Sequence, residues 1–589
     1  MFGRILGFEG SKMIIENLKH IADTNYIGYH VVFSETDHKI VGEIIGIDTQ
    51  KIIILLIGEI NGEVFSNGVI KKPSVNTVPR IIFKSELETI LGNQNFMNNN
   101  TLLFGSSPIY KEYFVTSDIN NFFANHFAIL GNSGSGKSCG VARILQNVFL
   151  SAKESVPKNA HMCLFDVYGE YCNTFNEMNN IDGLHFKKFT TEGQFGDGEF
   201  LTIPAYLLSI DDLAILLGAT EPSQLPVLSK AISLARIFTS EDPHAEDYKN
   251  NIIANSALDI LSSGKTANQM RDQVISLLTT YNTESFNLDS VIREPGYERT
   301  LRQCLNIDAQ GKINAINQVI NFMQQFIKVD IEQIELQGVI CYTLQDLYYA
   351  LEFALIDEGS LTSEIAHDRN NILKSRLQNI INSEQGKFFT FSEYVSMPNF
   401  VENFFKTPYN GELVTAQLVD VNLSFLDDKF AKAVTKIFSR IFFEYTTSLQ
   451  NRGSYSIHIL LEEAHRYVQN DSDIHVIGYN IFDRITKEGR KYGTILGFIT
   501  QRPNELSKTA LSQCSNFIIF RLFYPEDLEI VKGISSNVTD ETIEKIKTLH
   551  PGMGLVFGTA FKVPLLVSLP LPSPLPVSTS LKIDTIWYN

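Results

Sequence analysis

The chain has 589 residues, of which 44% are hydrophobic and 20% are charged, and its formal net charge is −17. Such a length exceeds a single hydrophobic core and predicts roughly three or four folding units. The acidic balance excludes a protein that coats nucleic acid through a generally basic surface, so any contact with nucleic acid must be local.

The sequence lacks the signals that would direct a chain to a membrane or an oxidising compartment. No apolar stretch reaches the ~20 residues of a membrane span, and the first residues lack the apolar segment of a signal peptide. The six cysteines form no Cys-x-x-Cys pair and are typical of reduced thiols. We therefore expect a cytoplasmic protein with no membrane partner.

The N-terminal region is typical of short strands joined by tight turns. Two runs rich in β-branched residues, Val41–Ile47 and Lys51–Ile57, are followed by Asn-Gly pairs at 61–62 and 67–68, which favour hairpins. We expect residues 1–100 to form a small β-barrel that serves assembly and carries no catalytic residues.

A phosphate-binding motif, Gly-Asn-Ser-Gly-Ser-Gly-Lys-Ser, occupies residues 131–138, between an apolar strand and an amphipathic helix. The glycines let backbone N–H groups surround phosphate oxygens. Lys137 is predicted to reach the β- and γ-phosphates, and the Ser138 hydroxyl to bind Mg²⁺. The chain is thus predicted to bind ATP and Mg²⁺. The candidate nucleotide-binding residues are Gly131, Asn132, Ser133, Gly134, Ser135, Gly136, Lys137, Ser138 and Cys139.

A second apolar strand ends at Asp166. An acid at this end of a parallel strand lies where an α/β sheet has its active site, although Asp166 could equally cap the next turn. Apolar residues then recur at helical spacing between about 226 and 389, which predicts an inserted helical bundle over residues 225–400. The bundle would divide an ATPase core into residues 101–224 and 401–562.

The α/β pattern resumes after the insertion, and the last residues, 563–589, are rich in Pro, Leu and Ser. This tail is incompatible with a regular helix and predicts an extended C-terminal arm that crosses a neighbour or another domain. We expect strands at Leu413–Val421, Ile457–Leu461, Thr494–Thr500, Phe517–Leu522 and Gly554–Phe557, and a helix at Val476–Lys491.

Paired acids follow the strand Ile457–Leu461, as the second element of a phosphate-loop ATPase requires. We assign Glu462 to magnesium and Glu463 to the activation of the attacking water. Gln501, at the end of the next strand, could sense the γ-phosphate or orient that water, or it could be a turn residue.

Several cations lie at the end of the helix predicted before Thr494. Cations are common at this end of a helix because they complement its dipole. One of them could instead reach the γ-phosphate of an adjacent subunit as an arginine finger. We favour Arg490 for this role, with Lys487 and Arg484 behind it.

Four segments, Leu461–His465, Lys487–Gly493, Thr500–Pro503 and Leu511–Cys514, closely resemble HerA, which groups with FtsK among the hexameric DNA-pumping ATPases. Phe165–Tyr171 also resembles the second strand of that family. The resemblance implies an α/β fold with a RecA-like phosphate-loop NTPase core, an N-terminal β-barrel and a helical insertion. It further implies a homohexamer with ATP sites between subunits and double-stranded DNA in the central pore.

The resemblance also implies a partner, because HerA-like rings work with a nuclease such as NurA. In anti-phage operons such rings work with other effectors, including sirtuin-like NAD-consuming enzymes. This chain departs from the family at two positions: Glu462 replaces the usual Asp, and Lys487 replaces the usual Arg, which loses a planar, bidentate phosphate contact.

Three functions remain open on this evidence. The first is an ATP-driven DNA translocase and helicase that feeds a nuclease. The second is a ring scaffold that activates an effector enzyme and uses ATP as a switch, which the acidic balance and the two departures favour. The third, a conjugation-type secretion ATPase, would normally need a membrane anchor, and none is visible in the sequence.

Overall fold

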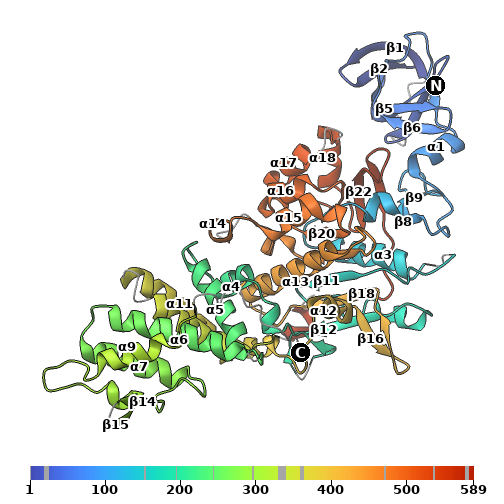
Figure 1. Cartoon of the computed structure of the whole chain (residues 1–589). Helices are drawn as coiled ribbons and strands as arrows, with labels where there is room; N and C mark the ends of the chain where they lie inside the picture. Colours follow the sequence, from blue (N-terminus) through green and yellow to red (C-terminus); the bar gives the residue numbers. More distant parts are fainter. Residues whose placement is uncertain are drawn as a thin grey trace. The chain divides into compact units, whose positions relative to one another are not determined.

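The computed structural model describes residues 2–18, 26–151, 154–193, 196–242, 244–294, 297–328, 340–358, 364–469, 473–534, 538–577 and 583–588. The chain forms two compact units (Figure 1). The first, which contains the phosphate-binding motif, comprises Met1–Phe200, Pro398–Asn470 and Asn480–Asn589, and the second comprises Leu201–Met397 and Asp471–Tyr479.

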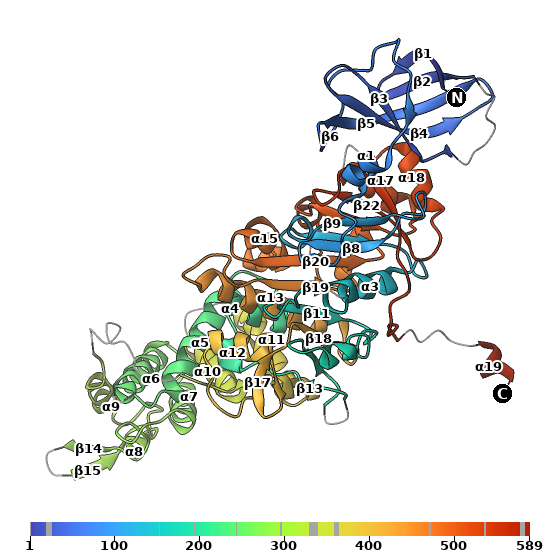
Figure 2. The same ribbon diagram turned by 90° about the vertical axis from the view of Figure 1, so that its right-hand side faces the viewer.

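The N-terminal part of the first unit is a seven-stranded antiparallel sheet with its own hydrophobic core (Figure 2). Alternate residues of its longest strand are buried, as expected for a sheet with one face on a core. The two runs rich in β-branched residues lie in strands of this sheet, and the small β-barrel domain over residues 1–100 stays a prediction. The strands of the sheet are β1 (Phe2–Glu9), β2 (Lys12–Asn17), β3 (His30–Ser34), β4 (Lys39–Ile47), β5 (Lys51–Asn61), β6 (Val64–Asn67) and β7 (Arg80–Ile81), and helix α1 (Lys84–Leu91) follows.

The remainder of the first unit is built on a twelve-stranded sheet, in the order β13-β12-β18-β11-β19-β20-β10-β21-β22-β23-β8-β9. The strands from β13 to β21 are all parallel, so their carboxyl ends share one edge. This arrangement confirms the predicted α/β core. The parallel strands are β10 (Phe127–Leu130), β11 (Met162–Asp166), β12 (Phe186–Thr190), β13 (Glu199–Phe200), β18 (Leu418–Asn422), β19 (Ile457–Leu461), β20 (Thr494–Thr500) and β21 (Asn516–Ile519).

The antiparallel end of the sheet takes up part of the tail that was expected to be an extended arm. Strand β23 (Leu565–Ser568) pairs with β22 (Met553–Gly558) and with β8 (Thr101–Ser106), which pairs with β9 (Phe114–Asp118). The prolines of this segment, Pro564 and Pro570, lie outside the strand and cost it no hydrogen bond.

The rest of the tail runs over the first unit itself. The Arg143 side chain donates to the carbonyl of Pro570 at 3.2 Å, and the Val577 N–H donates to the carbonyl of Glu170 at 2.7 Å. Residues 583–588 form a short helix, α19 (Ile583–Tyr588), so the expectation that the tail contains no regular helix is wrong at its end.

Helices cover both faces of the parallel sheet. Helix α3 (Lys137–Phe149) packs on one face, in a core that includes Leu164 of β11. Helix α13 (Asp428–Ser448) lies against the other face, where Phe438 contacts Phe165, the next residue of β11. Adjacent residues of a strand point to opposite faces of the sheet. Both faces of β11 are covered by helices, which explains why the strand is apolar up to Asp166.

Two sequence-based boundaries in this unit are wrong. The strand expected at Leu413–Val421 is interrupted at Gln417, whose side chain bonds the N–H of His185 and the carbonyl of Lys158, both at 2.7 Å. Its first part, β17 (Glu412–Thr415), instead forms a hairpin with β16 (Lys406–Tyr409). Only the second part, β18, enters the sheet.

The helix expected at Val476–Lys491 is also divided. Gly478 adopts a φ of 83°, which ends α14 (Asp473–Ile477). The Asn480 side chain then caps a new helix, α15 (Ile481–Glu488), which is followed by the 3₁₀ turn η8 (Gly489–Lys491). Helix α14 belongs to the second unit and α15 to the first.

The second unit is mainly helical, as predicted for the insertion. Among the helices of the described residues, none has the length and apolar character that crossing a bilayer takes. The unit contains α4 (Ile210–Leu217), α5 (Gln224–Thr239), α6 (Ala245–Ser262), α7 (Ala267–Thr280), α8 (Leu301–Cys304), α9 (Ile316–Gln324), α10 (Leu344–Glu358) and α11 (Glu364–Ile381), with the hairpin β14 (Val291–Glu294) and β15 (Tyr297–Thr300).

A buried carboxylate, Glu86, ties α1 to the N-terminal sheet. It accepts two hydrogen bonds from Arg80 at 2.6 and 2.8 Å, one from Lys39 at 2.9 Å and one from the N–H of Phe83 at 3.0 Å. Burial raises the pKa of this carboxyl, but the hydrogen bonds from Arg80, Lys39 and Phe83 lower it to about 2.

We expect Glu86→Gln to lower the free energy of unfolding by about 2 kcal/mol at neutral pH, because it removes charge-assisted hydrogen bonds. The folded pKa is below the ordinary value of 4.5, so the contribution of Glu86 is complete above pH 4.5 and is lost as the pH falls toward 2. Urea unfolding across this range measures the effect. The exposed Glu88 of the same helix gives the matched control, Glu88→Gln. An effect of Glu86→Gln that does not change with pH would contradict this assignment.

Candidate functional site

The phosphate-binding loop lies between the end of β10 and the start of α3. Gly134 and Gly136 have φ values of 72° and 90°, which side chains with a Cβ atom rarely adopt. A Cβ on Gly136 would also lie 2.7 Å from the backbone N of Gly552. The loop therefore needs glycine here, and it directs the first N–H groups of α3 toward the place where a phosphate would bind.

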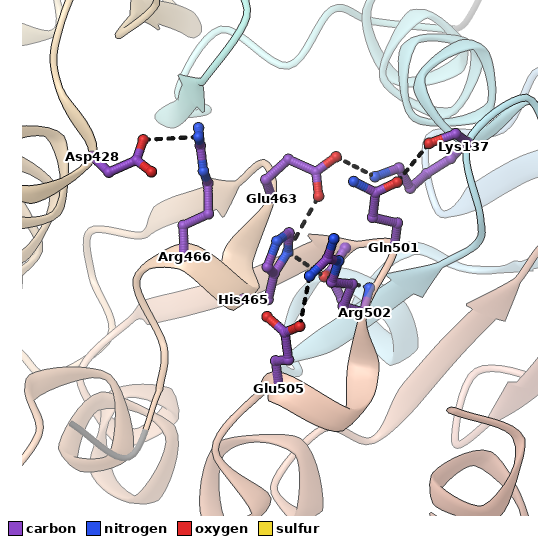
Figure 3. A network of polar contacts seen from close by, with 10 residues as sticks. Lys137, Asp428, Glu463, His465, Arg466, Gln501, Arg502 and Glu505 are labelled. Atoms are coloured by element: carbon purple, nitrogen blue, oxygen red, sulfur yellow. Dashed lines mark hydrogen bonds and ion pairs between the residues drawn. The ribbon is translucent and has the colours of Figure 1, made fainter. Parts of the chain in front are cut away.

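Lys137 and Glu463 meet at the centre of the site (Figure 3). The Lys137 Nζ lies 3.0 Å from the Glu463 Oε1, and both side chains are buried. Burial raises the pKa of Glu463, but His465 and Lys137 lower it by more, so the net shift is downward. Glu463 is therefore a carboxylate at neutral pH.

Glu463 has the geometry of a residue held for chemistry. Its φ of 45° places a non-glycine residue in the left-handed region, which costs of order 1–3 kcal/mol and is concentrated at functional sites. Its Oε2 is buried and lies 3.3 Å from the His465 Nδ1. This oxygen can accept a proton from a water molecule, as the sequence assignment of Glu463 requires.

Two further acids, Asp166 and Glu462, interact with each other at the same edge of the sheet. The Asp166 carboxyl accepts hydrogen bonds from the N–H groups of Tyr168, Gly169 and Tyr171 at 3.1, 2.8 and 2.8 Å. Burial raises the pKa of Glu462 well above its usual range, and the neighbouring Asp166 raises it further. Asp166 thus caps the turn and also lies beside Glu462, and a role for it in catalysis stays a prediction.

These residues fit a magnesium ion. The Glu462 Oε2 is buried without a hydrogen-bond partner among the described residues, and a divalent cation would compensate the crowded acids. No cluster of three His, Cys, Asp or Glu side chains suited to a metal occurs in the part of the chain that the structure describes. Mg²⁺ commonly takes one or two protein ligands and completes its shell with phosphates and water, so Ser138 and Glu462 suffice for a nucleotide-dependent site.

Gln501 is joined to the phosphate-binding loop. The Ser133 hydroxyl donates to its Oε1 at 2.6 Å, and the N–H of Gly131 donates to the carbonyl of Thr500 at 3.1 Å. Gln501 therefore lies where a side-chain amide can contact a γ-phosphate. A hollow of 460 Å³ opens beside it, lined by Asn132, Gln501, Arg502, Asn504, Glu505, Phe523, Tyr524, Glu526 and Asp527.

The cationic candidates lie elsewhere. The three cations are exposed, namely Arg484, Lys487 and Arg490. They precede the first residue of β20, whereas Gln501 follows the last residue of that strand. This strand has seven residues, which span about 20 Å at ~3.3 Å per residue. The structure therefore does not bring these cations to the catalytic edge of their own subunit.

The structure adds three residues that sequence reasoning did not select. His465 contacts Glu463 (Figure 3) and also Thr500. Glu170 lies beside Ser138. Burial raises the pKa of the Glu170 carboxyl, and the Ser138 hydroxyl lowers it by less. His465 and Glu170 fall within the segments that carry the family resemblance, which was the available signal. Nothing in the sequence marks Thr500 apart from its place before Gln501.

The chain is similar in sequence to known helicases. Residues 106–301 match a family model described as "Helicase HerA, central domain". Probable helicase MJ1565 of Methanocaldococcus jannaschii is 23% identical over 521 residues, which are 88% of this chain and 75% of that protein. The DNA double-strand break repair helicase HerA of Pyrococcus furiosus is 31% identical over 161 residues, or 25% of this chain and 29% of that protein.

Among solved structures, VirB4 of Thermoanaerobacter pseudethanolicus superposes with a TM-score of 0.43 at 11% identity. The superposition covers 80% of this chain and 96% of VirB4. A similarity of this degree has no bearing on function.

We expect Glu463→Gln to retain ATP binding but to reduce turnover about 100- to 10,000-fold, because it removes the proton acceptor. Lys137→Ala should instead abolish binding, since it removes the cation that contacts the phosphates. Fluorescent-nucleotide titration and steady-state phosphate release separate the two effects. Near-normal hydrolysis by Glu463→Gln would show that another residue activates the water.

Proposed function

We propose, because the chain belongs to the HerA family of ATP-hydrolysing helicases, that it forms a hexameric ring that moves double-stranded DNA through its central pore. The observation that carries the proposal is the buried contact between Lys137 and Glu463. Gln501 directly follows β20, the strand that lies between β19 and β10. This is the arrangement that phosphoryl transfer to water requires.

Each residue of the site has a role in this proposal. Lys137 and the N–H groups of the loop hold the phosphates of ATP, and Gln501 orients the water or the γ-phosphate. Glu463 accepts a proton from the attacking water through Oε2. Ser138 and Glu462 would hold Mg²⁺, which when bound neutralises developing charge on the phosphates.

A ring is proposed because the cations that the family resemblance points to, Arg490 and Lys487, lie away from the phosphate-binding loop of their own chain. Arg490 and Lys487 are exposed at the opposite edge of the same sheet, so they can serve only an adjacent subunit. The hollow beside Gln501 gives such a cation an approach, and its acidic residues, Glu505, Glu526 and Asp527, would attract it. The substitution of Arg by Lys at 487 favours Arg490 for the role.

The ring is proposed to serve a partner enzyme, either a NurA-like nuclease or an anti-phage effector. A second candidate function is a scaffold that activates that partner and uses ATP as a switch without pumping DNA. The net charge of −17 favours this second function, since DNA-handling surfaces are usually basic. In either case the ATP site and the ring are the same.

Arg490→Ala subunits should inactivate wild-type rings when the two proteins are mixed. The variant keeps its own loop and Glu463 but cannot complete the site of its neighbour, and loss of such a cation costs about 10³- to 10⁵-fold in turnover. ATP turnover measured against the mutant fraction should fall faster than in proportion. Lys491→Ala, also exposed on η8, is the matched control. A strictly proportional fall would exclude a trans-acting role for Arg490.

Linear duplex DNA should raise ATP turnover, and ATP should drive displacement of a third strand annealed to that duplex, if the ring pumps DNA. A scaffold would give neither result while still forming rings, which mass measurement with and without ATP would detect. Lys137→Ala provides the control for nucleotide dependence. Single subunits that hydrolyse ATP at the full rate would exclude both functions.

A further inference from the structure

His465 lies between the ends of β19 and β20, where it contacts a residue from each side. Its Nδ1 lies 3.3 Å from the Glu463 Oε2 and 3.0 Å from the Thr500 Oγ1. The side chain is only 11% exposed. Thr500 is the last residue of β20, directly before Gln501, and its Oγ1 also accepts a hydrogen bond from the N–H of Arg502 at 3.0 Å.

We propose that His465 is a positioning residue that holds Glu463 in its catalytic orientation and couples it to the strand that carries Gln501. The proposal depends on the role proposed above for Glu463. His465 itself contacts neither the phosphate-binding loop nor Gln501 in the described hydrogen bonds, so it is distinct from the residues that would touch ATP.

The protonation of the ring follows from its neighbours. A carboxylate oxygen can only accept a hydrogen bond, so the nitrogen that faces the Glu463 Oε2 must carry hydrogen. The Thr500 hydroxyl can accept from the same N–H. His465 therefore places one N–H between two oxygens, hydrogen-bonded to the Thr500 Oγ1 and in contact with the Glu463 Oε2 at 3.3 Å, and both neighbours set the orientation of its ring.

The contact matters most when nucleotide binds. Lys137 contacts the other oxygen of Glu463, Oε1, at 3.0 Å. A lysine that turns toward the phosphates of ATP weakens that contact, because its charge is then shared with the phosphate oxygens. His465, whose Nδ1 lies 3.3 Å from the Glu463 Oε2, then still holds the carboxylate. The backbone of Glu463 is in the left-handed region, which is strained for a residue with a side chain. Without a contact that holds it, the side chain is expected to leave its catalytic orientation.

Contacts join the phosphate-binding loop, the segment that follows β19 and the end of β20, and part of this network is drawn in Figure 3. Glu463 contacts Lys137 of the loop, His465 contacts Thr500 of β20, and Gln501 accepts from Ser133 of the same loop at 2.6 Å. A γ-phosphate that displaces Ser133 from Gln501 would therefore move the strand end to which His465 is bonded. His465 thus links recognition of the γ-phosphate to the orientation of the base.

The test compares two substitutions of His465. Alanine removes the donor, whereas asparagine can place its side-chain N–H group near the position of Nδ1. We expect His465→Ala to lower kcat about 10- to 100-fold, the usual cost of losing an orienting partner, with ATP affinity within about threefold of wild type. His465→Asn should recover most of that loss. Thr500→Val should reduce kcat less, Thr500→Ser should restore it, and Thr500→Val should add little to His465→Ala.

A matched control separates positioning from packing. His458 is also buried, on β19, where its Nε2 lies 2.8 Å from the carbonyl of Phe123, away from the site. His458→Ala should lower thermal stability without a selective loss of kcat. Tm and fluorescent-nucleotide affinity are measured for every variant, in the full-length protein.

Three outcomes would overturn the proposal. The first is an unchanged kcat in His465→Ala, and the second is an equal loss in His465→Ala and His465→Asn, which would indicate packing alone. The third is a loss of ATP affinity as large as the loss of kcat. Failure of the proposed function gives a different result, because Glu463→Gln would then hydrolyse ATP while the His465 variants could still be impaired.

Discussion

The site depends on the contact between Lys137 and Glu463, which are 326 residues apart in the chain. They meet because β10 and β19 are parallel and are separated only by β20, so that all three strands end at one edge. A buried ion pair adds little to stability by itself, since desolvation offsets the attraction. Its value here is that each partner holds the other in place until a phosphate competes for the lysine.

The same edge brings together buried acidic side chains: burial raises the pKa of both Glu462 and Asp166, and the neighbouring Asp166 raises that of Glu462 further. Glu462 and Asp166 are buried and interact with each other, and the Glu462 Oε2 has no hydrogen-bond partner among the described residues. Buried polar atoms without partners are rare and costly. The arrangement is therefore suited to a metal-bound nucleotide, which brings the missing positive charge and hydrogen-bond donors.

The sheet separates the two parts of the proposed machinery. One edge carries the loop, the acids and Gln501, and the other carries the exposed cations of α15 and η8. A single subunit cannot bring both edges to one phosphate, because β20 is rigid and fully hydrogen-bonded between its neighbours. This separation supports the proposed ring, in which a neighbouring subunit would place its opposite edge against the first.

The sequence by itself determined the loop at 131–138, the acids Glu462 and Glu463, the position of Gln501 and the alternation of strands and helices. These features depend on local patterns, namely glycines with positive φ, apolar strand-length runs and acids that follow them. Sequence resemblance alone singled out the segments that contain His465 and Glu170, without giving them a role.

Only the tertiary structure decided which strands are neighbours and which side chains face one another. The order β19-β20-β10 places Thr500 between Glu463 and the loop, and no local pattern encodes that adjacency. The two divided elements, at Gln417 and Gly478, and the strand within the proline-rich tail were likewise decided by hydrogen bonds and packing to distant segments. Propensity acts over a few residues, whereas strand order and side-chain partners are set by the burial of the whole sheet.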